Sequence, residues 1–255
     1  MNLFKGILLL IILITPLKAN TIYNLIKIPN LEIYETNTQN KLKYFYAESS
    51  FRLGVQKNIV CLNPNKKDLE EKYKIIYKNL SRYSYNYLKK INLKYIVLCE
   101  DLSISGIKTA GIPDNLMKTL ILDIKFNKDY FERVIHHEVF HIINDSFKEI
   151  FDKKIWSSFN IDSFKYAKCS TCTDKIGLDT YKNTDGFFTE YSRSTASEDM
   201  AEVFSHLMIG SSPNNRDPIL EKKHINKIRK IDKILNNKIS YIENKIKKID
   251  NTFIF

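Results

Sequence analysis

The segment Val134–Asn144, V-I-H-H-E-V-F-H-I-I-N, constrains the fold of this chain more than any other. Its apolar residues recur every three or four positions, which predicts an amphipathic helix. On that helix His137 and His141 stand one turn apart on the same face, so both ring nitrogens can bind one metal ion. Glu138 follows the first of them directly. The helix is expected to bury one apolar face, formed by Phe131, Val134, Ile135, Val139 and Ile142.

Glu138 stands where a general base would be needed. A catalytic zinc site keeps one position for water and lowers its pKa to about 7. A carboxylate beside a ligand can take the proton of that water and pass it to a leaving amine. His136 cannot replace His137 in the pair, because Phe140 occupies the position four residues later. We therefore expect His136 to be a packed or surface residue.

The third metal ligand must come from elsewhere. The extended motif with a later glycine and histidine is absent, since Asn144 and Phe147 occupy those positions. A second segment, S-E-D-M-A-E-V-F-S-H at residues 197–206, carries Glu198 and Glu202 one helical turn apart. Glu198 could complete the site, and Glu202 could accept the outer N–H of a ligating histidine. The alternative for both is a solvated acidic helix start.

Together the two segments resemble the glutamate-zincin metallopeptidases. The resemblance is closest to bacterial zinc-binding metallopeptidases and to the lethal-factor and Pro-Pro endopeptidase group. It rests on H-H-E-V-F-H and on G-F-F-T-E-Y-S-R-S-T-A-S-E-D-M-A-E-V-F, within residues 128–146 and 186–206. Two departures, Ser192 for alanine and Met200 for an aromatic residue, lie outside the ligand positions.

The resemblance implies a role for each matching residue. It implies one Zn²⁺ ion held by His137, His141 and Glu198, with Glu138 as base. It further implies a tyrosine seven residues before the third ligand, which is Tyr191, and a phenol there can donate to an oxyanion. The remaining implied residue is Glu202, which would support a histidine ligand. Asp145 and His206 lie near this site by helical phase, and neither receives a role.

The resemblance also implies a fold and a mode of substrate binding. The fold would be α+β and zincin-like, with a small mixed sheet and a backing helix behind the active-site helix. An edge strand above the cleft would bind an extended peptide by strand addition. The candidate strand is Ile107, Lys108, Thr109 and Ala110, and a buried ordinary strand is the alternative.

Periodicity predicts the other elements in one domain, residues 20–255. Residues 20–65 suggest short strands and loops, and residues 147–187 are irregular. The apolar stripe of the last helix is more typical of core packing than of a coiled coil, and dimerisation stays open. The predicted helices are Asp68–Ile91, Ser197–Ile209 and Ile219–Ile249, and the predicted strands are residues 93–99, 106–112 and 120–126.

The N-terminus predicts export. Lys5 precedes an apolar run that is shorter than the roughly 20 residues of a membrane span. Pro16 ends the run, and Ala19 offers a small residue for cleavage, so residues 1–19 read as a signal peptide. An uncleaved anchor is the alternative. The expected location is periplasmic or secreted, without a membrane span after signal removal.

The net charge of +11 arises from lysines spread along the chain and not from one basic segment. Such a distribution, in an exported protein, argues against a nucleic-acid partner. The expected partner is instead a peptide or protein substrate. A non-catalytic binding protein or toxin-like surface protein on the same scaffold is the competing hypothesis.

Four cysteines accompany this pattern: Cys61, Cys99, Cys169 and Cys172. The pair in C-S-T-C could form a local disulfide, bind a metal or exchange disulfides. A redox motif needs a thioredoxin-like βαβ pattern around it, and the sequence shows none. A zinc ribbon needs a second pair of closely spaced cysteines, which Cys61 and Cys99 do not supply. In an exported chain we favour two structural disulfides, Cys61–Cys99 and Cys169–Cys172.

Overall fold

Strand β5, Tyr95–Ile104, is the centre of a mixed sheet in the computed structural model. Its first half pairs in parallel with β2 and β8, and its second half pairs antiparallel with β4 and β6. The strand β7 pairs only with β8 and so forms one edge of the described sheet. The other strands are β1 (Leu31–Glu35), β2 (Lys43–Ala47), β3 (Phe51–Leu53), β4 (Ile59–Leu62), β6 (Ile107–Lys108), β7 (Gly111–Asp114) and β8 (Thr119–Asp123).

The structure describes residue 22 and residues 26–210 and 222–255. The predicted signal peptide, residues 1–19, lies outside this part of the chain, as does the start of the predicted last helix, residues 219–221. Within the described residues, none of the helices combines the length and apolar character that crossing a bilayer requires.

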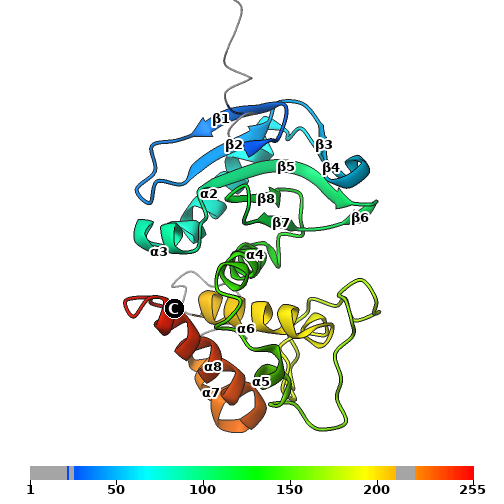
Figure 1. The fold of residues 1–255 in the computed structure, drawn as a ribbon, viewed down its shortest axis with the longest axis vertical. Coiled ribbons are helices and arrows are strands. Elements are labelled where there is room, and N and C mark those ends of the chain that lie inside the picture. Colours follow the sequence, from blue (N-terminus) through cyan, green and yellow to red (C-terminus); the bar gives the residue numbers. More distant parts are fainter. Residues whose placement is uncertain (1–21, 23–25, 211–221) are drawn as a thin grey trace, which may run out of the picture.

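Helices cover the sheet and continue below it (Figure 1). α2 packs against α4, and α4 lies between the sheet and α6. Two 3-10 turns, Val55–Lys57 and Tyr191–Arg193, complete the regular structure. The helices are α2 (Lys66–Leu80), α3 (Tyr85–Lys90), α4 (Phe131–Ser146), α5 (Lys153–Ser157), α6 (Ala196–Gly210), α7 (Lys222–Ile231) and α8 (Lys233–Ile249).

Alternation along β5 creates two apolar clusters, one on each face of the sheet. Ile96 and Leu98 join the larger cluster, which holds the apolar faces of α2, α4, α6 and α8. Tyr95, Val97 and Cys99 join the smaller cluster on the opposite face. The parallel, doubly covered β5 thus explains the nearly continuous apolar run in the sequence. The predicted α+β class is confirmed, and so is a helix carrying H-E-V-F-H beside a small mixed sheet.

Two predicted long helices are each divided, so those predictions are wrong. The helix predicted over Asp68–Ile91 ends at Leu80, and Ser84 begins α3 by accepting a hydrogen bond from Tyr87 N. The last helix is divided at Asp232, whose side chain accepts from Leu235 N and starts α8. Short polar side chains favour such caps over helix interiors, and here the caps prevail over the apolar period.

Asp129 and Glu132 have the sequence spacing of a capping box, which would start the helix at Asp129, but the structure contains no such box. α4 begins at Phe131, and its N-cap residue, Tyr130, makes no side-chain capping bond. Glu132 instead accepts a hydrogen bond from Asn79 of α2, 3.0 Å away. The acid of the expected box therefore joins two helices.

Both predicted disulfides are present. Cys61 of β4 is bonded to Cys99 of β5, and both are fully buried. Cys169 is bonded to Cys172, closing a tight turn in which Cys172 N donates to Cys169 O. Two disulfides are typical of proteins that fold in an oxidising compartment.

Candidate metal centre

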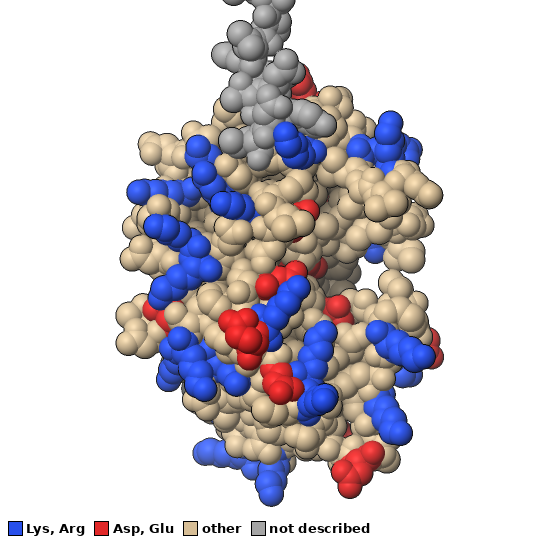
Figure 2. Space-filling model, in the orientation of Figure 1, with Lys and Arg blue, Asp and Glu red and all other residues tan. Residues whose placement is uncertain are grey.

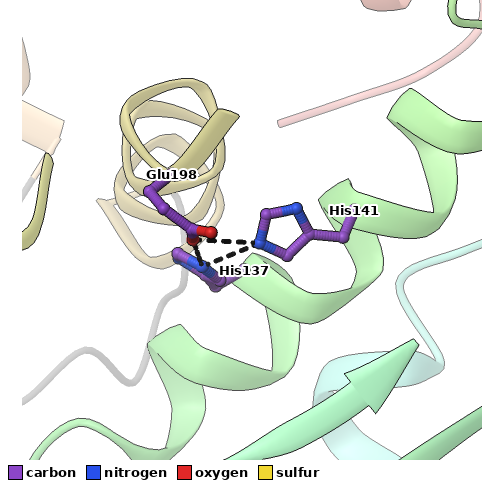
Figure 3. Close-up of side chains that lie close together, drawn as sticks. All are labelled: His137, His141 and Glu198. Atoms are coloured by element: carbon purple, nitrogen blue, oxygen red, sulfur yellow. Dashed lines mark hydrogen bonds and ion pairs between the residues drawn. The ribbon is translucent and has the colours of Figure 1, made fainter. Parts of the chain in front are cut away.

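The pair α4 and α6 forms the most extensive helix contact of the described chain, and it brings the predicted ligands together. The apolar face of α4 is buried as predicted, and the Phe140 ring packs 5.4 Å from the Phe204 ring of α6. This packing turns the polar faces of both helices toward each other. His137 and His141 from α4 then meet Glu198 from the first turn of α6 (Figure 3).

Three donor atoms form a nearly equilateral triangle. His137 Nε2 lies 2.9 Å from Glu198 Oε2, and His141 Nε2 lies 3.1 Å from each of these two atoms. Zinc bonds to nitrogen and oxygen of about 2.0–2.1 Å give tetrahedral edges of about 3.3 Å. The triangle is close to that size. Two imidazoles and one carboxylate therefore fit a zinc ion that retains an open position.

The charges of the site without a metal also indicate a cation. Burial alone would lower the pKa of His137, but hydrogen bonds to Glu198 and Glu202 raise it to about 10. Burial would raise the pKa of Glu198, yet His141 and His137 hold it well below the usual range. The two carboxylates thus stabilise a proton, and with it a positive charge, on the imidazole of His137 between them. A divalent metal ion can replace that proton.

Glu202 lies one turn beyond Glu198 and contacts the outer nitrogen of a ligand. Its Oε1 is 2.9 Å from His137 Nδ1, and its Oε2 accepts a hydrogen bond from Thr189 Oγ1 at 2.9 Å. Such a contact fixes the tautomer and leaves Nε2 free for a metal. Glu202 therefore lies within hydrogen-bond distance of His137, and its supporting role stays a prediction.

Glu138 is buried beside the ligands and under the edge strand β7. Burial raises the pKa of its carboxyl group, and the two neighbouring histidines oppose that rise. The strand can approach this closely because residue 111 is glycine. A Cβ placed on Gly111 would lie 2.7 Å from Glu138 Cγ.

Tyr191 begins the 3-10 turn before α6, and its ring centroid lies 5.9 Å from that of His137. Burial, followed by the charges of Glu198 and Glu138, raises the pKa of the phenol far above its ordinary value. The hydroxyl thus keeps its proton at neutral pH. It can act as a hydrogen-bond donor next to the metal site.

His136 and the four residues of the predicted substrate strand are not part of the triangle. His136 is fully buried as a packed residue, with Tyr83 Oη 2.7 Å from Nδ1 and Asn79 Oδ1 3.0 Å from Nε2. Ile107 and Lys108 of the predicted substrate strand form β6 and pair with β5. Thr109 and Ala110 connect β6 to β7.

Three residues near the site were not predicted from the sequence. Arg133 is buried one turn before His137, with Nε 3.9 Å from Glu202 Oε2. Thr189 contacts the same carboxylate, and Gly111 makes room for Glu138. Helical phase could have placed Arg133, which is four residues before the first ligand. The other two depend on contacts between distant segments.

The comparisons with known proteins gave one match. A family described as "Putative zinc-binding metallo-peptidase" matches residues 86–250, more than half of the chain. Neither the comparison with curated proteins nor that with solved structures found a match.

Proposed function

We propose that this chain, which belongs to the putative zinc-binding metallo-peptidase family, is an exported peptidase that uses Glu138 as general base. Membership makes it a zinc metallopeptidase, and the triangle of His137, His141 and Glu198 fits one zinc ion. The observation that supports the mechanism best is the convergence of three ligand atoms beside the buried Glu138 carboxylate.

Each side chain then has a distinct task. A bound zinc ion would polarise the attacking water and the peptide carbonyl. Glu138 accepts the proton of the water and returns it to the leaving amine. Burial raises the pKa of the Glu138 carboxyl group, which favours uptake of the proton from water, and the charges of His137 and His141 oppose that rise. The neutral phenol of Tyr191 donates a hydrogen bond to the carbonyl oxygen as negative charge develops there.

The substrate would bind along β7. This strand lies at the edge of the described sheet, packs on α4 and passes over Glu138 at Gly111. An extended peptide could add to that edge by main-chain hydrogen bonds. The proposed substrate strand therefore shifts from Ile107–Ala110 to Gly111–Asp114. The surface is hollowed on one side between the sheet-bearing part and the part that holds α6 (Figure 2).

Export is supported by the disulfides and by the N-terminal sequence. The partly exposed Cys169–Cys172 bridge would be reduced in most cytosols, whereas it persists in a periplasm or outside the cell. Figure 2 shows lysines and arginines scattered over one face with acidic residues between them. That face presents no single basic patch.

The decisive test compares the zinc-loaded wild type with Glu138→Gln on a library of unstructured peptides. We expect cleavage by the wild type, a loss of at least about 10³-fold in kcat for Glu138→Gln, and equal zinc content. The matched control is Asp145→Asn, which removes an exposed carboxylate from the same helix. Equal turnover by Glu138→Gln and wild type would refute the mechanism. Zinc binding without cleavage by any form would favour a binding protein on this scaffold.

A further inference from the structure

Arg133 and His206 form a buried cluster that the proposed function does not use. Arg133 is 6% exposed and His206 is fully buried. Arg133 stands on α4, one turn before His137, and His206 stands on α6, one turn after Glu202. The two residues therefore flank the contact between His137 and Glu202.

The hydrogen bonds of this cluster determine where its protons lie. His206 Nδ1 lies 2.8 Å from the carbonyl oxygen of Glu202, an acceptor, so Nδ1 carries the proton. His206 Nε2 must then accept, and it faces Arg133 Nη1 at 3.4 Å and Thr180 Oγ1 at 3.3 Å. Burial and the Arg133 charge lower the pKa of His206 to about 3, which agrees with a neutral ring.

His206 thus serves as a neutral acceptor for the guanidinium. Arg133 Nη1 also donates to Thr180 Oγ1 at 3.2 Å, and Nη2 donates to the carbonyl oxygen of Leu178. These partners occupy both terminal nitrogens of Arg133. They leave Nε, which makes no hydrogen bond, directed toward the Glu202 carboxylate 3.9 Å away.

We propose that Arg133, held by His206 and Thr180, is a positioning residue that keeps the Glu202 carboxylate oriented toward His137. This inference rests on the proposed function in one respect, that His137 is a zinc ligand. An isolated buried carboxylate would be strongly destabilised as an anion, and the paired guanidinium offsets that cost. Because Leu178 and Thr180 belong to the long segment between α4 and α6, Arg133 also couples that segment to the metal site.

The test is a double-mutant cycle read out as zinc affinity, measured by competition with a chromophoric chelator at pH 7. We expect Arg133→Met to weaken zinc binding about 10-fold or more, the usual effect of disturbing the partner of a ligand. In the Glu202→Gln background no charge remains to be held, so Arg133→Met should add less than about twofold. Arg133→Lys, which keeps the charge, should bind zinc more tightly than Arg133→Met.

Thr180→Val is the second variant, because Arg133→Met leaves a buried anion and could fail to fold. It removes the hydroxyl from Arg133 and His206 at nearly constant volume. When Glu202 is intact, we expect Thr180→Val to weaken zinc binding about three- to tenfold. In the Glu202→Gln background, we expect Thr180→Val to leave zinc binding unchanged. Equal losses in both backgrounds, or wild-type affinity of Arg133→Met, would overturn the proposal. Failure of the wild type to cleave peptides would refute the proposed function and leave this measurement unaffected.

Discussion

Substitution of Gly111 by alanine should selectively disable Glu138. The added Cβ would lie 2.7 Å from Glu138 Cγ and 3.1 Å from its Cδ. Carbon atoms in contact prefer about 3.5–4.0 Å, so the carboxylate or the strand must move by about 1 Å. A misplacement of that size can cost about 10²-fold in rate, or about 2.7 kcal/mol of transition-state stabilisation.

The rate should fall without loss of metal or fold. Gly111 does not have a positive φ, so alanine is compatible with the backbone there. Glu138 contributes none of the three donor atoms of the metal triangle, so the zinc content should stay unchanged. The assay is kcat/KM on a cleaved peptide, with Leu116→Ala in the exposed turn between β7 and β8 as control. A Gly111→Ala enzyme with wild-type kcat/KM would show that the strand does not position Glu138.

Three further predictions concern the polar groups behind the metal site. Glu202→Gln should weaken zinc binding about 10- to 100-fold in a chelator competition, and unchanged affinity would contradict the proposed support of its ligand. His206 has a folded pKa of about 3, below the ordinary value near 6.5, so the unfolded state binds more protons between these values. Stability of the metal-free protein should therefore fall as pH drops from about 6.5 toward 3, by up to about 1.4 kcal/mol per pH unit. His206→Gln should show a correspondingly smaller slope in urea unfolding, and an identical slope would refute this assignment. Lys238→Met should cost about 3–5 kcal/mol because it leaves the buried Asp199 unpaired, and Asp199→Asn/Lys238→Met should recover most of that loss in the same assay.

The ligand triangle could be predicted because helical spacing determines it almost completely. His137 and His141 need only one regular turn to share a face, and the same holds for Glu198 and Glu202. The sequence contains both spacings, and the packing of α4 on α6 then brings the two pairs together. Periodicity does not predict the distance between the two helices, because that distance depends on how their buried apolar faces pack.

The parts that sequence reasoning missed depend on single contacts between distant segments. The helix boundaries at Ser84 and Asp232 are set by side-chain caps, which an apolar period of three and four cannot reveal. The role of Gly111 can be recognised only from the register of β7 on β8 and from the close approach of β7 to Glu138 of α4. Helical phase places Arg133 on the same face as His137, but the sequence does not show what holds it there, since its partners come from residues 178–206.

The C-terminal helix belongs to the same unit as the metal site. Asp199 follows Glu198 directly and makes a fully buried contact with Lys238 of α8 at 2.7 Å. Trp156 Nε1 and Tyr166 Oη donate to the same carboxylate oxygen, at 2.9 and 2.6 Å. The first turn of α6 is thus fixed from below by α8 and by the segment after α4. This contact gives a physical reason for a family match that extends to residue 250, one residue beyond the end of α8. A chain ending before α8 would lose the partner of Asp199, and the backbone that presents Glu198 would lose its support.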